Sequence, residues 1–211
     1  MKKVAIAFVA AVMCCCICSA QAAIITLSEF SSDSTPADVL DAAVEFSIVD
    51  SQLTIVISNL TDGLDGGEDN GFDIMSLFFN VTDNVTGLTL TTPSTGWKLC
   101  SFSNITKAGG FGQFDYALID VLGSSSNHID GESSKTFTLS LTHDGSGVSD
   151  LDFYTDLSSI PPGDNAMYLA AKFVRGPDDD SAFGGNNAPE PATIALLGFG
   201  SLALIRRKRA A

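Results

Sequence analysis

The chain has 211 residues and a formal net charge of −14 at pH 7, but its ends and its middle differ in composition. Residues 23 to 188 hold 24 of the 25 carboxylates and only five of the 11 lysines and arginines, a net charge of −19 with histidine neutral. This charge excludes nucleic acid as a partner, because phosphate binding requires clustered cations. Four of the five cysteines lie within residues 14 to 18, so a disulfide framework is excluded as well.

The first 22 residues have the three zones of a secretory signal peptide. Two lysines precede 15 uncharged residues, and a pair of small residues, Ala20 and Ala22, follows. We expect cleavage after Ala22, which leaves Ala23 at the new amino end and makes the Sec export machinery and signal peptidase partners of the chain. A retained membrane anchor is the alternative, although the apolar run is shorter than the ~20 residues that a bilayer core requires.

The last residues also form three zones: Pro189-Glu190-Pro191, an uncharged run from Ala192 to Ile205, and the basic cluster of Arg206, Arg207, Lys208 and Arg209. Residues 189–211 thereby resemble the PEP-CTERM sorting signal of bacterial exported proteins, which is named after its Pro-Glu-Pro motif. The resemblance is confined to this tail. It implies recognition by an exosortase, a membrane enzyme of Gram-negative bacteria that make exopolysaccharide, with this chain as the substrate.

The physical properties of the tail agree with such a signal. A helix from Thr193 to Ile205 would be about 20 Å long, short of a hydrocarbon core of about 30 Å. The basic cluster nevertheless favours a transmembrane helix, because four consecutive cations stay on the cytoplasmic side and reach for lipid headgroups. We expect an inner-membrane tether before processing. A plain tail anchor and a C-terminal helix packed on the domain are the alternatives.

Between the two ends, residues 23–175 show the alternation of apolar and polar residues that is typical of β-strands. Apolar residues take every second position in residues 44–48 and again in residues 53–57, with Asp50-Ser51 between them as a tight turn. One short stretch, Pro36 to Ala43, is helix-like. Comparable strand patterns occur in residues 74–81, 88–90, 137–141 and 168–174. We predict an all-β antiparallel β-sandwich of eight or nine strands, of which a jelly roll is one form.

Residues 176–188 are rich in glycine, aspartate and asparagine and contain few apolar side chains. Such a composition favours a flexible linker, because it cannot offset the entropy lost on ordering the chain. We expect this linker to hold the domain away from the membrane.

One acidic loop is a candidate calcium site. Calcium prefers flexible loops rich in oxygen ligands, but the spacing here differs from that of an EF-hand, and an ordinary solvated acidic loop is the alternative. The candidate ligands are Asp62, Asp65, Glu68, Asp69 and Asp73.

The sequence contains no recognisable catalytic motif, and we predict no catalytic residue and no cofactor other than calcium. Cys100 could pair with His128 or His143 as a nucleophile and base, but a strand cysteine is better interpreted as a small buried apolar residue. Trp97 and Tyr154 are candidate sugar contacts, with core packing as the alternative.

These features together predict an exported protein that an exosortase sorts to the cell surface or the extracellular matrix. We expect a non-enzymatic acidic β-sandwich that is associated with exopolysaccharide and biofilm. A carbohydrate-binding module, with or without calcium, is the alternative, and an exported hydrolase is the third hypothesis.

Overall fold

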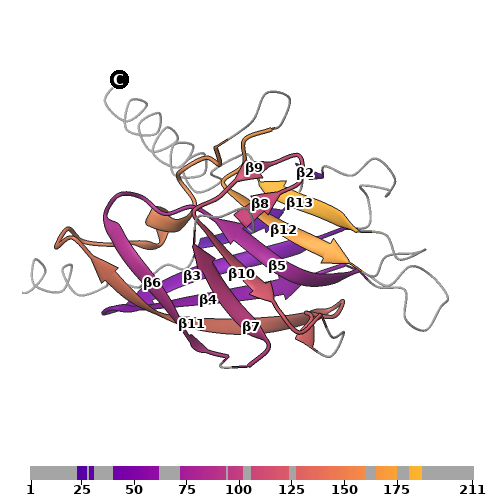
Figure 1. Cartoon of the computed structure of the whole chain (residues 1–211), viewed down its shortest axis with the longest axis horizontal. Helices are drawn as coiled ribbons and strands as arrows, with labels where there is room; N and C mark the ends of the chain where they lie inside the picture. Colours follow the sequence, from indigo (N-terminus) through magenta and orange to yellow (C-terminus); the bar gives the residue numbers. More distant parts are fainter. Residues whose placement is uncertain are drawn as a thin grey trace, which may run out of the picture.

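The computed structural model describes residues 23–27, 29–30, 40–61, 72–93, 95–101, 106–123, 127–159, 165–174 and 181–186, which form two antiparallel sheets (Figure 1). The five-stranded sheet has the order β1 (Ala23–Leu27), β3 (Ala42–Val49), β4 (Gln52–Asn59), β11 (Ser133–His143) and β6 (Val85–Thr92). The six-stranded sheet has the order β2 (Glu29–Phe30), β13 (Ala182–Asn186), β12 (Leu169–Val174), β5 (Asp73–Phe79), β10 (Tyr116–Asp120) and β7 (Trp97–Ser101). The remaining elements are a small hairpin, β8 (Lys107–Ala108) with β9 (Gly112–Gln113), and the short 3-10 helix η3 (Asp150–Phe153).

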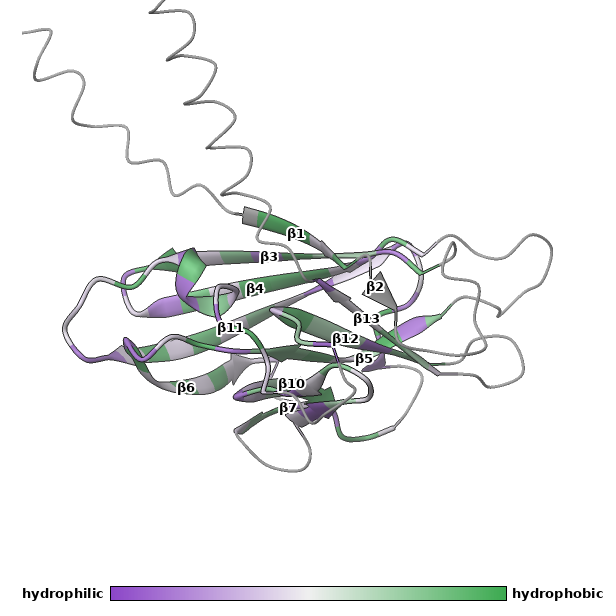
Figure 2. Cartoon of the chain, turned by 90° about the horizontal axis from the view of Figure 1, so that it is seen from above, coloured by the Kyte–Doolittle hydropathy of each residue, from purple (hydrophilic) through white to green (hydrophobic). Residues whose placement is uncertain are grey.

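The two sheets pack face to face as a sandwich, which confirms the predicted fold class. Seen from above, β3 and β4 lie in one layer, and β5, β10 and β7 lie in the other (Figure 2). The predicted turn at Asp50-Ser51 joins β3 to β4, where Val49 pairs with Gln52. Asp50 takes a φ of 56°, a left-handed conformation that aspartate tolerates in tight turns.

Aromatic side chains fill the space between the sheets. Phe46 of β3 contacts Phe79 of β5 in an edge-on arrangement, with ring centroids 6.1 Å apart, and stacks on Phe153 of η3. Trp97 of β7 packs edge-on against Phe137 of β11 at 4.8 Å. The Phe46–Phe79 and Trp97–Phe137 pairs join opposite sheets, so the alternation in the sequence places one face of each strand in a common core.

A second apolar cluster covers the outer face of the six-stranded sheet. Phe111 and Phe114, from the segment that carries β8 and β9, pack with Phe78 and Ala117 of that sheet. Strand β5 is therefore buried on both faces, and six of its seven residues are buried. The nearly continuous apolar sequence of β5 reflects this position.

Strand β13 corrects the predicted linker over residues 176–188, because residues 182–186 form a strand that pairs with β12 on one side and β2 on the other. Gly185 is required by close packing. A Cβ atom added to Gly185 would lie 3.0 Å from both Met167 Cγ and Phe111 Cε2. Strand β13 thus has a composition typical of linkers because it lies very close to neighbouring side chains.

Two other expectations are partly tested. Ala42 and Ala43, the end of the helix-like stretch, belong to β3 and not to a helix. The predicted signal peptide (1–22) and sorting tail (189–211) lie outside the described residues. Within the part of the chain that is described, no helix is long and apolar enough to cross a membrane.

Replacing Gly185 by valine should lower the thermal stability of the domain, since the new side chain would collide with Met167 and Phe111. We expect a loss of about 1–3 kcal/mol in the free energy of unfolding, as for other overpacked sites. Gly147→Val is the control, because a Cβ at Gly147 meets no atom within 4 Å. Urea denaturation of both variants measures the difference. Equal stability of the two variants would contradict a packed β13.

Candidate functional site

The two predicted sugar contacts lie in the core. Trp97 is 3% exposed, and its Nε1 donates a hydrogen bond to the carbonyl oxygen of Asn127 at 2.9 Å. Tyr154 is 2% exposed, and burial together with the neighbouring Asp150 carboxylate raises the pKa of its hydroxyl to about 12. Neither ring presents a face to solvent, as stacking on a sugar would require, so the packing alternative describes both side chains.

The candidate calcium ligands are only partly described. Asp62, Asp65, Glu68 and Asp69 lie outside the described residues. Asp73 is 4% exposed at the start of β5 and faces His128. Among the residues that the structure describes, no group of three histidine, cysteine, aspartate or glutamate side chains could hold a metal ion. Calcium binding by the acidic loop stays a prediction.

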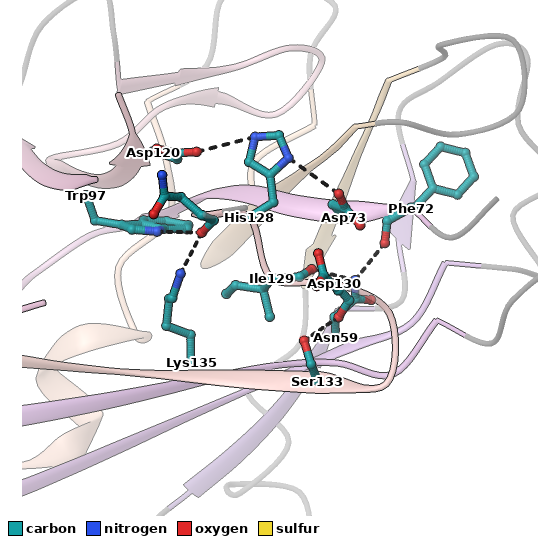
Figure 3. A network of polar contacts seen from close by, with 11 residues as sticks. Asn59, Phe72, Asp73, Trp97, Asp120, His128, Ile129, Asp130, Ser133 and Lys135 are labelled. Carbon is teal, nitrogen blue, oxygen red and sulfur yellow. Dashed lines mark hydrogen bonds and ion pairs between the residues drawn. The ribbon is translucent and has the colours of Figure 1, made fainter. Parts of the chain in front are cut away.

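His128 lies between two carboxylates, an arrangement that no pattern in the sequence predicted (Figure 3). Its Nδ1 is 3.4 Å from Oδ2 of Asp73, and its Nε2 is 3.4 Å from Oδ2 of Asp120. The imidazole side chain is only 7% exposed. The ring therefore lies between two buried carboxylate groups, one near each of its nitrogens.

The contacts of His128 are electrostatic rather than well-aligned hydrogen bonds, because neither ring nitrogen makes a hydrogen bond of good geometry. Its two partners stand on opposite sides of the ring, so one metal ion could not bind both ring nitrogens. Cys100, which the sequence analysis interpreted as a small apolar strand residue rather than a nucleophile, lies half-buried on β7 with a free thiol. The near neighbours of the His128 ring nitrogens are Asp73 and Asp120, so this group is best described as a buried polar cluster with a structural role.

The backbone around His128 joins the two sheets. Ile129 and Ile74 exchange both backbone hydrogen bonds at 2.9 Å, which attaches the segment to β5. From the other sheet, Asn59 Nδ2 donates to the carbonyl of Ile129 at 3.0 Å and to that of Phe72 at 2.6 Å. These hydrogen bonds connect the two sheets at one end of the sandwich.

Lys135 of β11 adds a cation to this end of the sandwich. Its Nζ donates to the carbonyl of Asn127 at 2.6 Å and lies 5.3 Å from the centre of the Trp97 ring. Burial lowers the pKa of the Lys135 ammonium, while the carboxylates of Asp120 and Asp130 oppose that effect. Lys135, a described cation at this end of the sandwich, therefore lies near the buried carboxylate of Asp120.

A second group of charges surrounds Asp156. Burial raises the pKa of the Asp156 carboxyl, and repulsion from Asp115, Asp83 and Asp152 raises it further. Local hydrogen bonds hold these neighbours in place. The amide of Val81 donates to Asp115 Oδ2 at 3.2 Å, and the hydroxyl of Thr82 donates to Asp152. The carboxylates around Asp156 thus concentrate negative charge at the protein surface.

Asn59→Ala should destabilise the domain by about 2–3 kcal/mol, because two buried carbonyl groups lose their donor. Asn59→Asp should cost more, since a carboxylate would face those same carbonyls. Asn84→Ala, which removes only a 3.4 Å contact of a half-buried amide, is the control and should stay within about 0.5 kcal/mol of wild type. Chemical denaturation provides the ranking, and an Asn59→Asp variant as stable as wild type would contradict the described network.

Asp156→Asn should raise the melting temperature at pH 7, because it removes a charge held among like charges. Because the pKa of Asp156 is raised in the folded state, its ionised carboxylate lowers the stability of the domain at pH values above that folded pKa. This destabilisation disappears as the pH falls toward the unfolded pKa of about 3.9. The gain should stay under about 1 kcal/mol, since solvent screens a largely exposed carboxylate. Asp144→Asn is the control: hydrogen bonds from Ser146 lower the pKa of Asp144, so no gain is expected. Thermal melts from pH 3 to 8 measure both.

Comparison with known proteins identifies the tail. The family model of the PEP-CTERM protein-sorting motif matches residues 187–209, as the sequence predicted. No curated protein and no solved structure matches the chain. The match begins directly after Asn186, the last residue of β13. The chain thus carries, immediately after an antiparallel β-sandwich, the sorting motif of an exported protein that an exosortase processes.

Proposed function

We propose that this protein is a non-enzymatic component of the bacterial cell surface or extracellular matrix, associated with exopolysaccharide. The observation that carries the proposal is the PEP-CTERM motif at residues 187–209, which follows the sandwich without an intervening domain. The signal peptide at the amino end directs export of the chain, and the sorting motif at the carboxyl end directs its processing. Both signals act on the β-sandwich between them. The ectodomain is then the cargo, and the exosortase is the enzyme.

The charge of the ectodomain supports a role in a hydrated polymer layer. Residues 23–188 carry a net charge of −19, which keeps the domain soluble and strongly hydrated. Surface carboxylates such as those around Asp156 gather divalent cations from the medium. Divalent cations held in this way would link the protein to acidic polysaccharide chains.

The structure gives less support to a carbohydrate-binding module. Binding of that kind uses aromatic rings that stack on sugars, and the two candidate rings, Trp97 and Tyr154, are buried. A hydrolase would require convergent catalytic side chains. The buried His128 network joins strand ends and has too little exposed surface to receive a polymer.

Fractionation of the native host, with and without its exosortase, tests the proposal. With the enzyme, we expect the tail to be removed and the protein to be recovered with the extracellular matrix. Without it, the full tail should stay in the inner membrane. Replacing Arg206, Arg207, Lys208 and Arg209 by glutamine should give the same retention or mis-sorting, because the positive-inside signal is lost.

A cell strain that makes no exopolysaccharide separates the two parts of the proposal. The processed protein should then appear in the medium in place of the matrix. Recovery of the full-length chain from the cytosol would refute sorting, and an unchanged matrix fraction in the polysaccharide-free strain would refute the association with polysaccharide.

A further inference from the structure

Three of the few cations of the ectodomain lie on one side of the sandwich. Residues 23–188 hold only five lysines and arginines, against 24 carboxylates. Lys98 and Lys172 belong to the six-stranded sheet, and Lys107 belongs to the hairpin of β8 and β9 beside its outer face. Lys98 and Lys107 are exposed, and Lys172 is half-buried. We call these three residues the outer lysines.

Strand pairing places two of the outer lysines in one row across the sheet. Lys172 of β12 pairs with the buried Ser76 of β5. Ser76 also pairs with Ile119 of β10, which pairs in turn with Lys98 of β7. Neighbouring strands lie about 4.8 Å apart, so three such steps separate the two lysine Cα atoms by about 14 Å. The neighbours of both lysines along their own strands pack in the inner core, so the lysine side chains lie on the outer face.

The third outer lysine lies on the same side of the sandwich. Ala108, its neighbour in β8, packs in the second apolar cluster, whereas Lys107 itself is exposed. The hairpin lies beside β12 and β13 (Figure 1), and a Cβ atom added to Gly109 would lie 3.2 Å from Cε2 of Phe183. The ammonium of Lys172 is 5.9 Å from the centre of that same Phe183 ring. The hairpin thus brings Lys107 to the part of the face that carries Lys172.

The outer lysines make no ion pairs within the described ranges. In that part of the chain, none of their ammonium groups lies within 4.0 Å of a carboxylate oxygen. Lys135 differs from them, because its ammonium donates to the carbonyl of Asn127 and lies over the Trp97 ring. Although the ectodomain has 24 carboxylates, the positive charge of the outer lysines therefore stays available to an external anion.

We propose that the outer lysines bind the acidic groups of polysaccharide chains, the carboxylates or sulfates that such polymers carry. The proposal rests on the proposed function and names the contact site for the polysaccharide. It is a direct contact, which acts alongside the divalent cations that surface carboxylates gather. Charge complementarity selects the partner, because an anionic polymer is attracted to this side of the domain and repelled by its acidic surfaces.

The net charge of −19 does not prevent such a contact. At physiological ionic strength, exposed charges more than about 8 Å apart are largely screened, so the nearest charges dominate. Duplex DNA fits the outer lysines less well. It carries one charge per about 1.7 Å, and two lysines about 14 Å apart neutralise few of those charges. An acidic polysaccharide carries no more than a few charges on each sugar unit and suits widely spaced cations.

Affinity electrophoresis of the processed protein, purified from its native host, tests the proposal. One native gel contains alginate, a polymer of uronic acids, and another contains neutral dextran. EDTA in both gels removes divalent cations, so that only direct contacts remain. The test variant carries Lys98→Gln, Lys107→Gln and Lys172→Gln. The control variant lowers the net charge equally on the exposed face of β11, in the other sheet, by Ser134→Glu, Thr136→Glu and Ser140→Glu.

We expect alginate, but not dextran, to retard the wild-type protein. The glutamine variant should bind alginate about tenfold more weakly, because each exposed ion pair contributes roughly a factor of two to three. The control variant should bind within about twofold of wild type, since its added charges are screened from the outer lysines. Arginine at the same three lysine positions should restore binding. Melting temperatures of all variants show whether each is folded.

Three results would overturn the proposal: no retardation of the wild-type protein by alginate, undiminished binding by the folded glutamine variant, or an equal loss of binding in the control variant. The last result would show that net charge alone governs the interaction. Fractionation of the native host decides the proposed function separately. A protein that is recovered with the matrix but is not retarded by alginate would refute the contact through the outer lysines and leave the proposed function intact.

Discussion

The close approach of β13 to its neighbours is the constraint on which the closed ectodomain depends. Gly185 leaves room for Met167 and Phe111 only because it has no side chain. With that room, β13 lies between β12 and β2 and completes the six-stranded sheet. The same placement brings Asn186 to Thr26 and joins the end of the domain to its beginning. Removal of β13 would leave β12 and the two-residue β2 without their shared neighbour, as well as exposing the apolar surface beneath them.

Charge is distributed according to burial. At one end of the sandwich, the carboxylates of Asp73 and Asp120 are buried, and His128 lies between them. Around Asp156, where the solvent has access, the neighbours that raise its pKa are all carboxylates. Water and ions screen exposed charges at little cost, whereas a buried carboxylate needs a partner. A strongly acidic protein can therefore fold with few cations, provided that most of its carboxylates stay exposed and the few buried ones have polar neighbours.

The sequence predicted the parts of this molecule that depend on local pattern. Strands β3, β4 and β11 alternate because one face is buried and the other is not, and the sorting tail could be recognised because its zones follow one another along the chain. Strand β13 was misinterpreted as a linker, because glycine and asparagine lower strand propensity and the close packing that requires them is visible only in three dimensions. The ion pair of His128 with Asp73 joins residues far apart in sequence, so no local pattern could predict it.

The order of the strands links folding to sorting. Because β13 is an interior strand of its sheet and the last of the described strands, the six-stranded sheet cannot be completed until residue 186 is available. The sorting motif comes next, because the family match begins at residue 187. Pairing of β13 with β2, which lies about 150 residues earlier in the chain, has a high loop-closure cost and is slow. Completion of the six-stranded sheet and availability of the sorting motif therefore depend on adjacent residues of the chain.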